Sequence, residues 1–516
     1  MEREEVKNDI LLIQPKNLLA TNNYPPLGLI SIGTVLEKEG YKVDILPTSR
    51  FSNWKDIIRE NIDRYLFIGV TVLTTEVIHA IELTKFVKKL KPNLPIVWGG
   101  WHVTLFPEQP IESGLVDYVV VGDGDKLVIT LAEAIKNHTH LEPILRNKEH
   151  IDMNTLPEPN YSLVMDLESF IEDDLTDIFN KFINYKIRWL PYQSSRGCPH
   201  RCLFCINVVT DNTKYRTKSA EIVVNELENI QVKYDITHFK ILDDNFFADI
   251  KRVKEICKLI LERDLEFTWD VECRTDYFRK GFVDDSILSL LKKAGCVQFT
   301  MGIESGAQES LDKMCKDTTV EENENAIKKL HKHNIIPRLS FIVDIPGEKK
   351  EDIIKTQQFL NKIRQICGDK MEAGVVTYRP YPKSKFHDIL VEDGLIEVPK
   401  TLEEWTKEYN VRLYGMYDNK KPWQKNYKLS TNVAFFNTQD TDLREHQLNR
   451  KLDKLFYRIF IRIFRIRTDK MIYVFPMDRL VYTFWRDNYY KRRESLYKTI
   501  DKSAYKGILG PKTQGV

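Results

Sequence analysis

Short apolar runs alternate with amphipathic helical patterns in two successive series along this 516-residue chain. This alternation limits the possible folds more than any other feature of the sequence. In the first series the predicted strands cover residues 9–14, 42–46, 66–72, 95–98 and 116–121, and the predicted helices cover residues 27–39, 76–90 and 126–136. Five strands with intervening helices predict a doubly wound parallel sheet of flavodoxin type.

The second series begins after Pro191 and contains six apolar runs. The predicted strands cover residues 192–195, 237–242, 267–272, 297–302, 337–343 and 374–378, and the predicted helices cover residues 220–233, 249–263, 284–294, 320–332 and 350–365. Six strands joined by parallel crossovers predict a partial barrel of six β/α units. Its active end is expected at the carboxyl edge of the strands.

These patterns predict an α/β chain with four regions. They are a flavodoxin-like domain at residues 1–150, a linker at 151–190, the partial barrel at 191–385 and a mostly helical, aromatic-rich region at 386–516. The linker is expected to be extended because prolines recur at alternate positions within residues 153–161, and an acidic stretch follows at 168–177.

Composition is that of an ordinary soluble protein. Apolar residues make up 42% of the chain and the net charge is only +2, so charge gives no reason to expect a nucleic-acid partner. Residues 1–9 are charged and lack an apolar signal core, and no window approaches the roughly twenty uncharged apolar residues of a membrane span. We therefore expect a cytoplasmic protein.

Three cysteines, Cys198, Cys202 and Cys205, lie on one short loop after the first predicted barrel strand. Three thiolates can hold three irons of a cubane iron–sulfur cluster and leave the fourth iron without a protein ligand. A zinc site is the weaker interpretation, because the only nearby fourth ligand, His200, sits between the first two thiols on a tight loop. The other five cysteines are scattered singly, which excludes a disulfide framework.

The spacing Cys-x3-Cys-x2-Cys, with Phe204 before the last thiol, resembles the signature of the radical S-adenosylmethionine (SAM) superfamily. The resemblance implies a 4Fe-4S cluster held by the three cysteines and SAM bound at the open iron. One electron from the cluster would then cleave SAM to methionine and a 5′-deoxyadenosyl radical.

Turns after the strands of the first series resemble the cobalamin-binding domain found in one branch of that superfamily. The matching segments are residues 25–28, 99–108 and 122–125, the last with aspartates where glutamate is more usual. The resemblance implies a cobalamin site at Thr71, Thr74, Gly99, Gly100, His102, Gly122, Asp123 and Gly124. The chain lacks an Asp-x-His-x-x-Gly element, so no histidine is expected below the cobalt. Because any such sheet needs glycine turns, an empty or repurposed cleft is the alternative.

Polar residues follow successive barrel strands and supply candidate SAM contacts. By resemblance, Asp243 or Asp244 would meet the methionine ammonium, Arg274 its carboxylate, and Glu304 or Ser305 the ribose, while Phe204 and the backbone near Ile342 would border the adenine. Charge complementarity independently favours an acid for the amine and a guanidinium for the carboxylate.

Each of these residues also has a purely structural interpretation. The aspartate pair could cap the helix near residue 249, Arg274 could pair with Asp276, and Glu304 could end its strand. Asp344 stands where the family commonly has glycine, and it could touch substrate or change the turn.

Near the C-terminus, residues 452–466 form an amphipathic pattern. Apolar residues at 452, 455, 456, 459, 460 and 463 follow one helical face, and Arg458, Arg462 and Arg465 follow another. We expect the apolar face to dock on the barrel with the arginines in solvent. Peripheral contact with an anionic membrane is the alternative.

Together these features predict a cobalamin-dependent radical SAM enzyme, a methyltransferase acting on an unactivated carbon of a small or lipid-like substrate. An electron donor such as flavodoxin or ferredoxin would be its protein partner. An oxidative cyclase related to the anaerobic magnesium-porphyrin cyclases, or a rearranging enzyme, is the alternative within the superfamily. A non-catalytic sensor of redox state or cobalamin is the alternative of another class.

Overall fold

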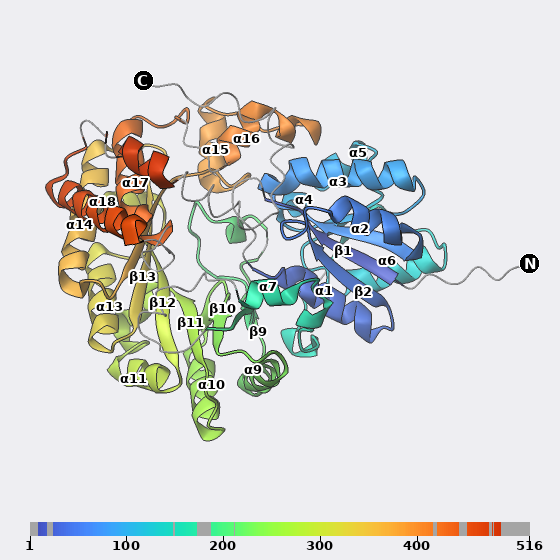
Figure 1. Cartoon of the computed structure of the whole chain (residues 1–516), viewed down its shortest axis with the longest axis horizontal. Coiled ribbons are helices and arrows are strands. Elements are labelled where there is room, and N and C mark those ends of the chain that lie inside the picture. The colour runs from blue at the N-terminus through green and yellow to red at the C-terminus, as the bar shows by residue number, and fades with distance from the viewer. Residues whose placement is uncertain are drawn as a thin grey trace, which may run out of the picture.

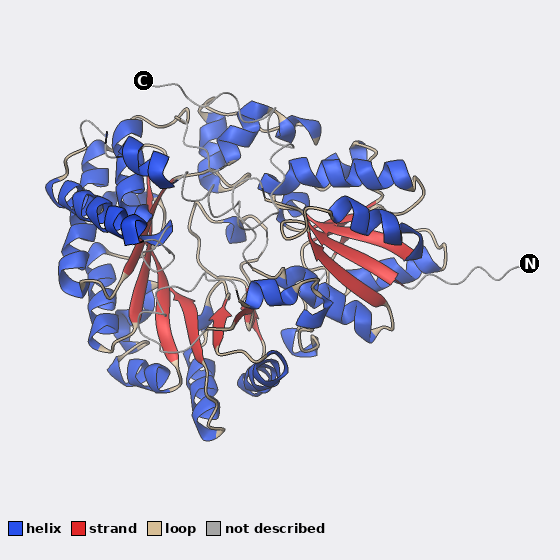
Figure 2. Ribbon diagram, viewed as in Figure 1, coloured by secondary structure: helices blue, strands red, loops and turns tan. Residues whose placement is uncertain are grey.

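The computed structural model describes residues 9–17, 24–147, 150–172, 187–210, 212–415, 420–442, 451–473, 477 and 479–486. Two parallel six-stranded sheets form the centres of two adjoining α/β units, and a helical C-terminal region follows (Figure 1). Figure 2 shows both sheets with helices packed against them. The predicted fold class is confirmed.

The first sheet has the order β2-β1-β3-β4-β5-β6, and all its neighbours are parallel, as in flavodoxin-type folds. Its strands are β1 (Asp9–Gln14), β2 (Lys42–Pro47), β3 (Tyr65–Thr71), β4 (Ile96–Gly99), β5 (Tyr118–Val121) and β6 (Ile144–Arg146). Its helices are α1 (Leu27–Lys38), α2 (Trp54–Asn61), α3 (Val77–Leu90), α4 (Trp101–Leu105), α5 (Glu108–Glu112) and α6 (Leu127–Lys136). The sequence pattern missed β6, which is only three residues long.

The predicted linker packs closely against the first unit in its described part. Val164 forms a bridge with Ile45 of β2, and α7 (Leu167–Ile171) follows. Tyr161 is fully buried and donates a hydrogen bond to the Pro191 carbonyl at the start of the second unit. Part of the acidic stretch, residues 173–177, lies outside the described residues.

The second sheet has the order β14-β13-β12-β11-β10-β7, again all parallel. Its strands are β7 (Trp189–Tyr192), β10 (His238–Ile241), β11 (Thr268–Cys273), β12 (Cys296–Glu304), β13 (Ile336–Val343) and β14 (Glu372–Thr377). Its helices are α9 (Ala220–Tyr234), α10 (Ile250–Glu262), α11 (Asp285–Lys293), α12 (Gln308–Lys313), α13 (Val320–Lys332) and α14 (Lys350–Cys367). This open, partial barrel agrees with the prediction, although β7 begins three residues earlier than expected.

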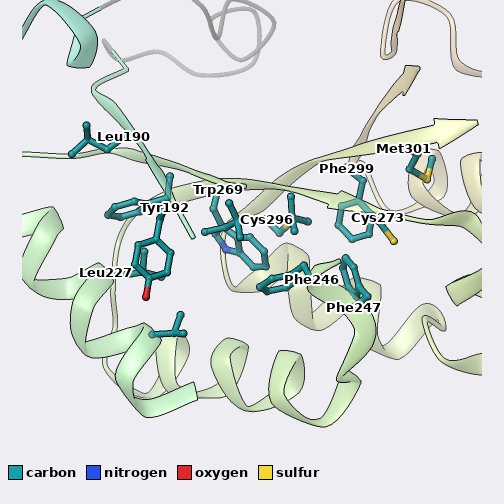
Figure 3. Close-up of a cluster of buried hydrophobic side chains, with 14 of the residues drawn as sticks. Leu190, Tyr192, Leu227, Phe246, Phe247, Trp269, Cys273, Cys296, Phe299 and Met301 are labelled. Atoms are coloured by element: carbon teal, nitrogen blue, oxygen red, sulfur yellow. The ribbon is translucent and has the colours of Figure 1, made fainter. Parts of the chain in front are cut away.

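One face of the second sheet is apolar and lies under the helices. Figure 3 shows part of this core, where side chains of β11 and β12 such as Trp269 and Phe299 meet Phe246 and Phe247. Since side chains alternate along a strand, the opposite face carries the intervening residues, and many of these are polar. The core therefore fixes which strand residues face away from the helices.

The C-terminal region begins with α15 (Lys385–Glu392) and α16 (Glu408–Tyr414) and continues with α17 (Tyr427–Asp442) and α18 (Lys451–Lys470). Helix α17 packs along β14, the edge strand of the second sheet, and α18 packs on α14 and α17. A covered edge strand cannot pair with another chain. No helix in the described part of the chain combines the length and apolarity that a bilayer-spanning segment needs.

Candidate functional site

The three clustered cysteines lie on a loop that several backbone hydrogen bonds hold in place. The loop is enclosed by a small antiparallel pair, β8 (Ser195–Arg196) and β9 (Arg216–Thr217). The Cys198 amide donates to the Asn212 carbonyl over 3.0 Å, and the Leu203 amide donates to Met314 over 3.0 Å. Gly197 has φ +91°, and a side chain there would collide with the Lys214 carbonyl. These hydrogen bonds and the steric limit at Gly197 thus determine the shape of the loop.

The thiols themselves fit cluster ligation. All three are free, Cys202 is buried, and Cys198 and Cys205 are half-buried. Burial raises the pKa of Cys205 to about 11, so forming the thiolate in the folded protein costs free energy. Coordination to iron would stabilise the thiolate and offset this cost. Arg274 Nη1 lies 3.3 Å from the Cys202 sulfur and supplies a positive charge beside it.

The two aspartates after β10 both face the cysteine loop, but they bond differently. Asp243 is fully buried, and its two oxygens accept four hydrogen bonds from the amides and hydroxyls of Ser194 and Ser195. Asp244 accepts from the Gly197 amide at 2.9 Å and from Asn207 at 2.9 Å. Both aspartates therefore bond to the backbone just before the thiols, and Asp244 also bonds to the Asn207 side chain after them. Neither caps the helix at residue 250, because Asp249 does so.

Arg274, which follows β11, lies against the same loop. Besides the Cys202 sulfur, its guanidinium donates to the Lys316 carbonyl and to Asp276 Oδ1 at 3.0 Å. The Asp276 pair that the sequence offered as an alternative is therefore present together with the contact to the cluster loop. Lys316 also lies over the ring of Phe204, 5.9 Å from its centroid, so the predicted adenine-side residue is close by.

Glu304 is the last residue of β12 and Ser305 follows it, and the two side chains have different partners. Glu304 has φ +60° and accepts a hydrogen bond from Lys316 Nζ at 2.7 Å, both side chains being buried. The Ser305 hydroxyl is fully buried and pairs with the Thr356 hydroxyl of α14 at 2.9 Å. Glu304 is thus joined to the surroundings of the cluster loop, whereas Ser305 is used in packing.

A cavity of about 690 Å³ lies at the carboxyl edge of the first sheet and extends to Asp244 beside the cysteine loop. This volume is within the roughly 300–1,000 Å³ range of ligand pockets. Its lining includes the predicted residues Thr71, Gly99, Gly100, Gly122, Asp123 and Gly124. A Cβ added at Gly28 would meet no atom within 4 Å, so glycine keeps this wall open for a flat ligand. These features fit a corrin.

His102 and Thr74, also predicted as cobalamin contacts, lie behind the cavity wall. His102 is fully buried, and Thr74 Oγ1 lies 3.3 Å from its Nδ1. Its ring packs edge-on against Trp405 of the C-terminal region, with centroids 4.9 Å apart. Burial lowers the pKa of His102 to about 3, so the ring is neutral. Trp101 and Thr104 of the same segment line the cavity instead.

An ion-pair network that the sequence did not predict joins the two units between the cavity and the thiols. Arg196, two residues before Cys198, contacts Asp125 at 2.7 Å and Asp123 at 3.1 Å. Arg216 also contacts Asp123, and Ser31 donates to Asp125. The aspartates of the turn at 122–125 thus bind the second unit. No motif marks either arginine, so only the fold could reveal the pairs.

The helix-free face of the second sheet carries charged residues in register. Lys240 pairs with Asp270 at 3.2 Å, and Arg338 pairs with Glu372 at 3.3 Å. Glu272 lies in register with Thr300 and Arg338, but its side chain forms no hydrogen bond or ion pair with any described residue. It remains accessible to solvent, yet its protein surroundings raise its pKa to about 7, mainly by burial. That combination is expected of an internal recess, because water reaches the carboxyl but solvates it poorly.

Comparison with known families agrees with this architecture. Residues 18–132 match the B12 binding domain, and residues 192–360 match the radical SAM superfamily. The chain therefore carries a B12 binding domain followed by a radical SAM domain. It is a cobalamin-dependent radical SAM enzyme, and its cofactors are a 4Fe-4S cluster, SAM and cobalamin.

Curated relatives include an uncharacterized methyltransferase of Pyrococcus horikoshii, 27% identical over 401 residues that cover 75% of this chain and 84% of the relative. The anaerobic magnesium-protoporphyrin IX monomethyl ester cyclase of Rubrivivax gelatinosus is 27% identical over 386 residues, which cover 72% and 67% of the two chains.

Two solved structures share the fold. The radical SAM methyltransferase TsrM from Kitasatospora setae, with cobalamin and a [4Fe-4S] cluster bound, has a TM-score of 0.61 at 19% identity and 76% coverage of both chains. The cobalamin-dependent radical enzyme OxsB has a TM-score of 0.69 at 15% identity, covering 89% of this chain and 71% of its own.

Proposed function

We propose that the protein methylates an unactivated carbon of a small organic substrate. The observation that carries the proposal is that one cavity extends from the glycine turns of the B12 domain to Asp244 beside the cysteine loop. A methyl donor in this cavity and a radical generated at the loop would meet the same substrate. Several relatives are named as methyltransferases, among them the Pyrococcus protein and a cytidylyl-2-hydroxyethylphosphonate methyltransferase of Streptomyces wedmorensis.

The cofactors supply the difficult chemistry. When they are bound, a reduced 4Fe-4S cluster provides the electron that cleaves SAM, and cobalamin provides a transferable methyl group. Reduction requires an external donor, for which we propose a flavodoxin or ferredoxin.

The chain's own residues position these groups. We assign Cys198, Cys202 and Cys205 as the cluster ligands. Arg274 places a permanent positive charge at the Cys202 sulfur and at the SAM side of the loop, where it suits the methionine carboxylate. Asp244 borders both the loop and the cavity, so it is the better candidate of the aspartate pair for the SAM ammonium. Asp243 is a positioning residue, because its two oxygens already accept four hydrogen bonds from Ser194 and Ser195.

The other predicted contacts also divide into residues that would touch a cofactor and residues that position the site. Glu304, held by Lys316 near Phe204, is placed to meet a ribose hydroxyl. Ser305 is engaged by Thr356 and positions the strand end instead. In the first unit, the glycines and Thr71 border the proposed corrin site, while Thr74 and His102 support its wall from behind.

The proposal is tested with anoxically reconstituted holoprotein, a reductant, a metabolite extract and SAM that carries a ¹³C-labelled methyl group. Methylation uses SAM in two ways, so 5′-deoxyadenosine and S-adenosylhomocysteine should both form, and the label should appear in a new product. Deoxyadenosine without S-adenosylhomocysteine or a labelled product would overturn methylation.

A cyclase is the second candidate, because the magnesium-protoporphyrin cyclase is as similar to this chain as the Pyrococcus methyltransferase. A cyclase would form deoxyadenosine and an unlabelled product. A sensor would form no deoxyadenosine at all, even with an intact cluster. The same experiment therefore separates all three classes.

A further inference from the structure

Helix α18 carries two separate apolar stripes, and only one of them is buried. Tyr457, Phe460, Ile461 and Phe464 pack inward against the neighbouring helices. A second stripe remains in solvent, with between 41% and 61% of each residue exposed; its members are Leu452, Leu455, Phe456, Ile459 and Ile466. Of the six apolar positions predicted to dock on the barrel, 460 is buried and 463 is partly buried, whereas 452, 455, 456 and 459 are exposed. Helix α18 does pack on α14 with its arginines exposed, but the stripe that it buries is centred on Tyr457, Phe460 and Phe464.

A second segment beside α18 repeats this arrangement. Residues 479–486 are helical, and Tyr482 is fully buried between Phe460 and Phe464, at centroid distances of 5.3 and 5.1 Å. Four apolar side chains of this segment and of the helical residue just before it are 52% to 73% exposed and follow a helical spacing; they are Met477, Leu480, Val481 and Phe484. We call the outward apolar residues of α18 and of residues 477–484 the C-terminal apolar surface.

Such an accumulation is unusual for a water-exposed surface. Soluble proteins expose apolar side chains singly, as this chain does at Val232 and Phe282, but larger exposed patches mark interaction sites. Nine exposed apolar residues on two helices that pack together cannot be ascribed to scatter. The surface requires an occupant.

Charge identifies the chemistry of that occupant. Residues 451–486 contain nine Lys and Arg but only three Asp, and one of these, Asp453, is buried against Trp485. Arg458, Arg462 and Arg465 are exposed at i, i+4 and i+7, a stripe that runs directly beside the outward apolar stripe of α18. An apolar stripe flanked by cations suits a surface that is anionic outside and apolar beneath.

We propose that the C-terminal apolar surface binds an anionic phospholipid bilayer, with α18 lying in the plane of the interface. The apolar side chains would enter the boundary between headgroups and acyl chains, and the arginines would contact lipid phosphates. Neither helix crosses the membrane in this arrangement. The proposal does not depend on the reaction that the enzyme catalyses.

The test is flotation of anoxically reconstituted holoprotein with vesicles of phosphatidylglycerol and phosphatidylcholine, compared with phosphatidylcholine alone. We expect flotation with the anionic vesicles, and at least a tenfold loss in the double variant Leu455→Glu/Ile459→Glu. Both positions are exposed, so the variant should fold and cleave SAM in solution like the wild type. Val232→Glu, a single change of an exposed apolar residue to an acid on α9, should float normally.

Three results would overturn the proposal. They are absence of flotation at low ionic strength, unchanged flotation of the double variant, and a wild-type dimer in sedimentation that the double variant dissociates. The last result would assign the surface to a second copy of the chain. Methyl transfer is measured separately, so failure of one proposal leaves the other intact.

Discussion

Arg196 Nη1 lies 2.7 Å from Asp125 Oδ2, and this pair joins the B12 domain to the residue that comes two positions before the first cluster cysteine. Only 13% of the arginine side chain and 3% of the aspartate side chain are exposed. Separating a nearly buried ion pair is costly, because it leaves a buried charge without a partner. The pair therefore fixes the cofactor cavity relative to the cysteine loop.

Asp125→Asn should destabilise the protein by about 3 kcal/mol at neutral pH, since it removes one partner of a buried pair. Burial alone would raise the pKa of Asp125, but Arg196 and Ser31 lower it below its ordinary value. The stabilisation is therefore present above the ordinary aspartate pKa and is lost as the pH falls through the lowered folded-state value. Denaturant unfolding at several pH values measures both effects.

The matched control for this variant is Asp56→Asn, because Asp56 pairs with Arg59 on the surface with about half of each side chain exposed. Its effect should stay within about 0.5 kcal/mol. Equal effects of the two substitutions would contradict a special role for the Arg196 pair.

Cys202→Ala should remove the cluster without removing cobalamin. The variant should retain cobalt after anoxic reconstitution, but its iron content and its formation of deoxyadenosine should fall to background, since two thiolates cannot hold three irons. Iron and cobalt analysis together with product chromatography give the answer. Cys257→Ala alters a buried core thiol and should keep both metals. Normal iron in the Cys202 variant would show that other residues bind the cluster.

Gly28→Phe should close the cavity. Gly28 lines the cavity on α1, and an added side chain would meet no other atom nearby, so it would project into the space instead of disturbing the core. We expect cobalamin affinity to fall at least tenfold while cluster assembly continues. Gly28→Ala adds a single methyl group and should cause a smaller loss. Spectroscopic titration with cobalamin measures the series, and unchanged affinity of the Phe variant would remove cobalamin from this cavity.

Sequence patterns predicted both sheets and the place of the cysteine loop, because alternating apolar periodicity and parallel crossovers leave few topologies. They also predicted that Asp244 and Arg274 lie near the loop, since parallel strands end at the same edge of the sheet. The pair of Arg274 with Asp276 was foreseen as an alternative, but the other partners of these side chains could not be predicted. Asp243 is saturated by serines 48 and 49 positions away, and Arg196 meets an aspartate 71 positions away. The prediction of which α18 residues are buried was only partly right for a related reason. Apolar residues occupy two stripes of the helix, and only tertiary packing selects which stripe is buried.

Glu272→Gln should change the pH dependence of stability. Burial raises the pKa of this carboxyl to about 7, so its contribution is fully present below the ordinary glutamate pKa and is lost as the pH rises through 7. The wild type should therefore lose more stability between pH 5 and pH 8 than the glutamine variant, whose side chain stays neutral. Unfolding curves at both pH values measure the difference. Glu39→Gln, an exposed change, should leave the pH dependence unaltered.

Asp344, at the end of β13, fastens the C-terminal region over the barrel edge. Its carboxylate accepts a hydrogen bond from Ser430 at 2.6 Å, and its carbonyl accepts one from Trp423 Nε1 at 3.1 Å. Its φ of +65° explains why glycine suits this turn, since the left-handed region costs other residues roughly 1–2 kcal/mol. The carboxylate thus compensates for strain by holding α17.

Substitution separates these two contributions. Asp344→Gly relieves the strain but loses Ser430, so global stability should change by no more than about 1 kcal/mol, while hydrogen exchange at the start of α17 should accelerate. Asp344→Ala keeps the strain and loses the contact, so it should be the least stable variant. Asp344→Asn tolerates the conformation and keeps an acceptor, so it should stay near wild type. Thermal unfolding with hydrogen-exchange mass spectrometry gives the order, and an alanine variant as stable as glycine would exclude backbone strain.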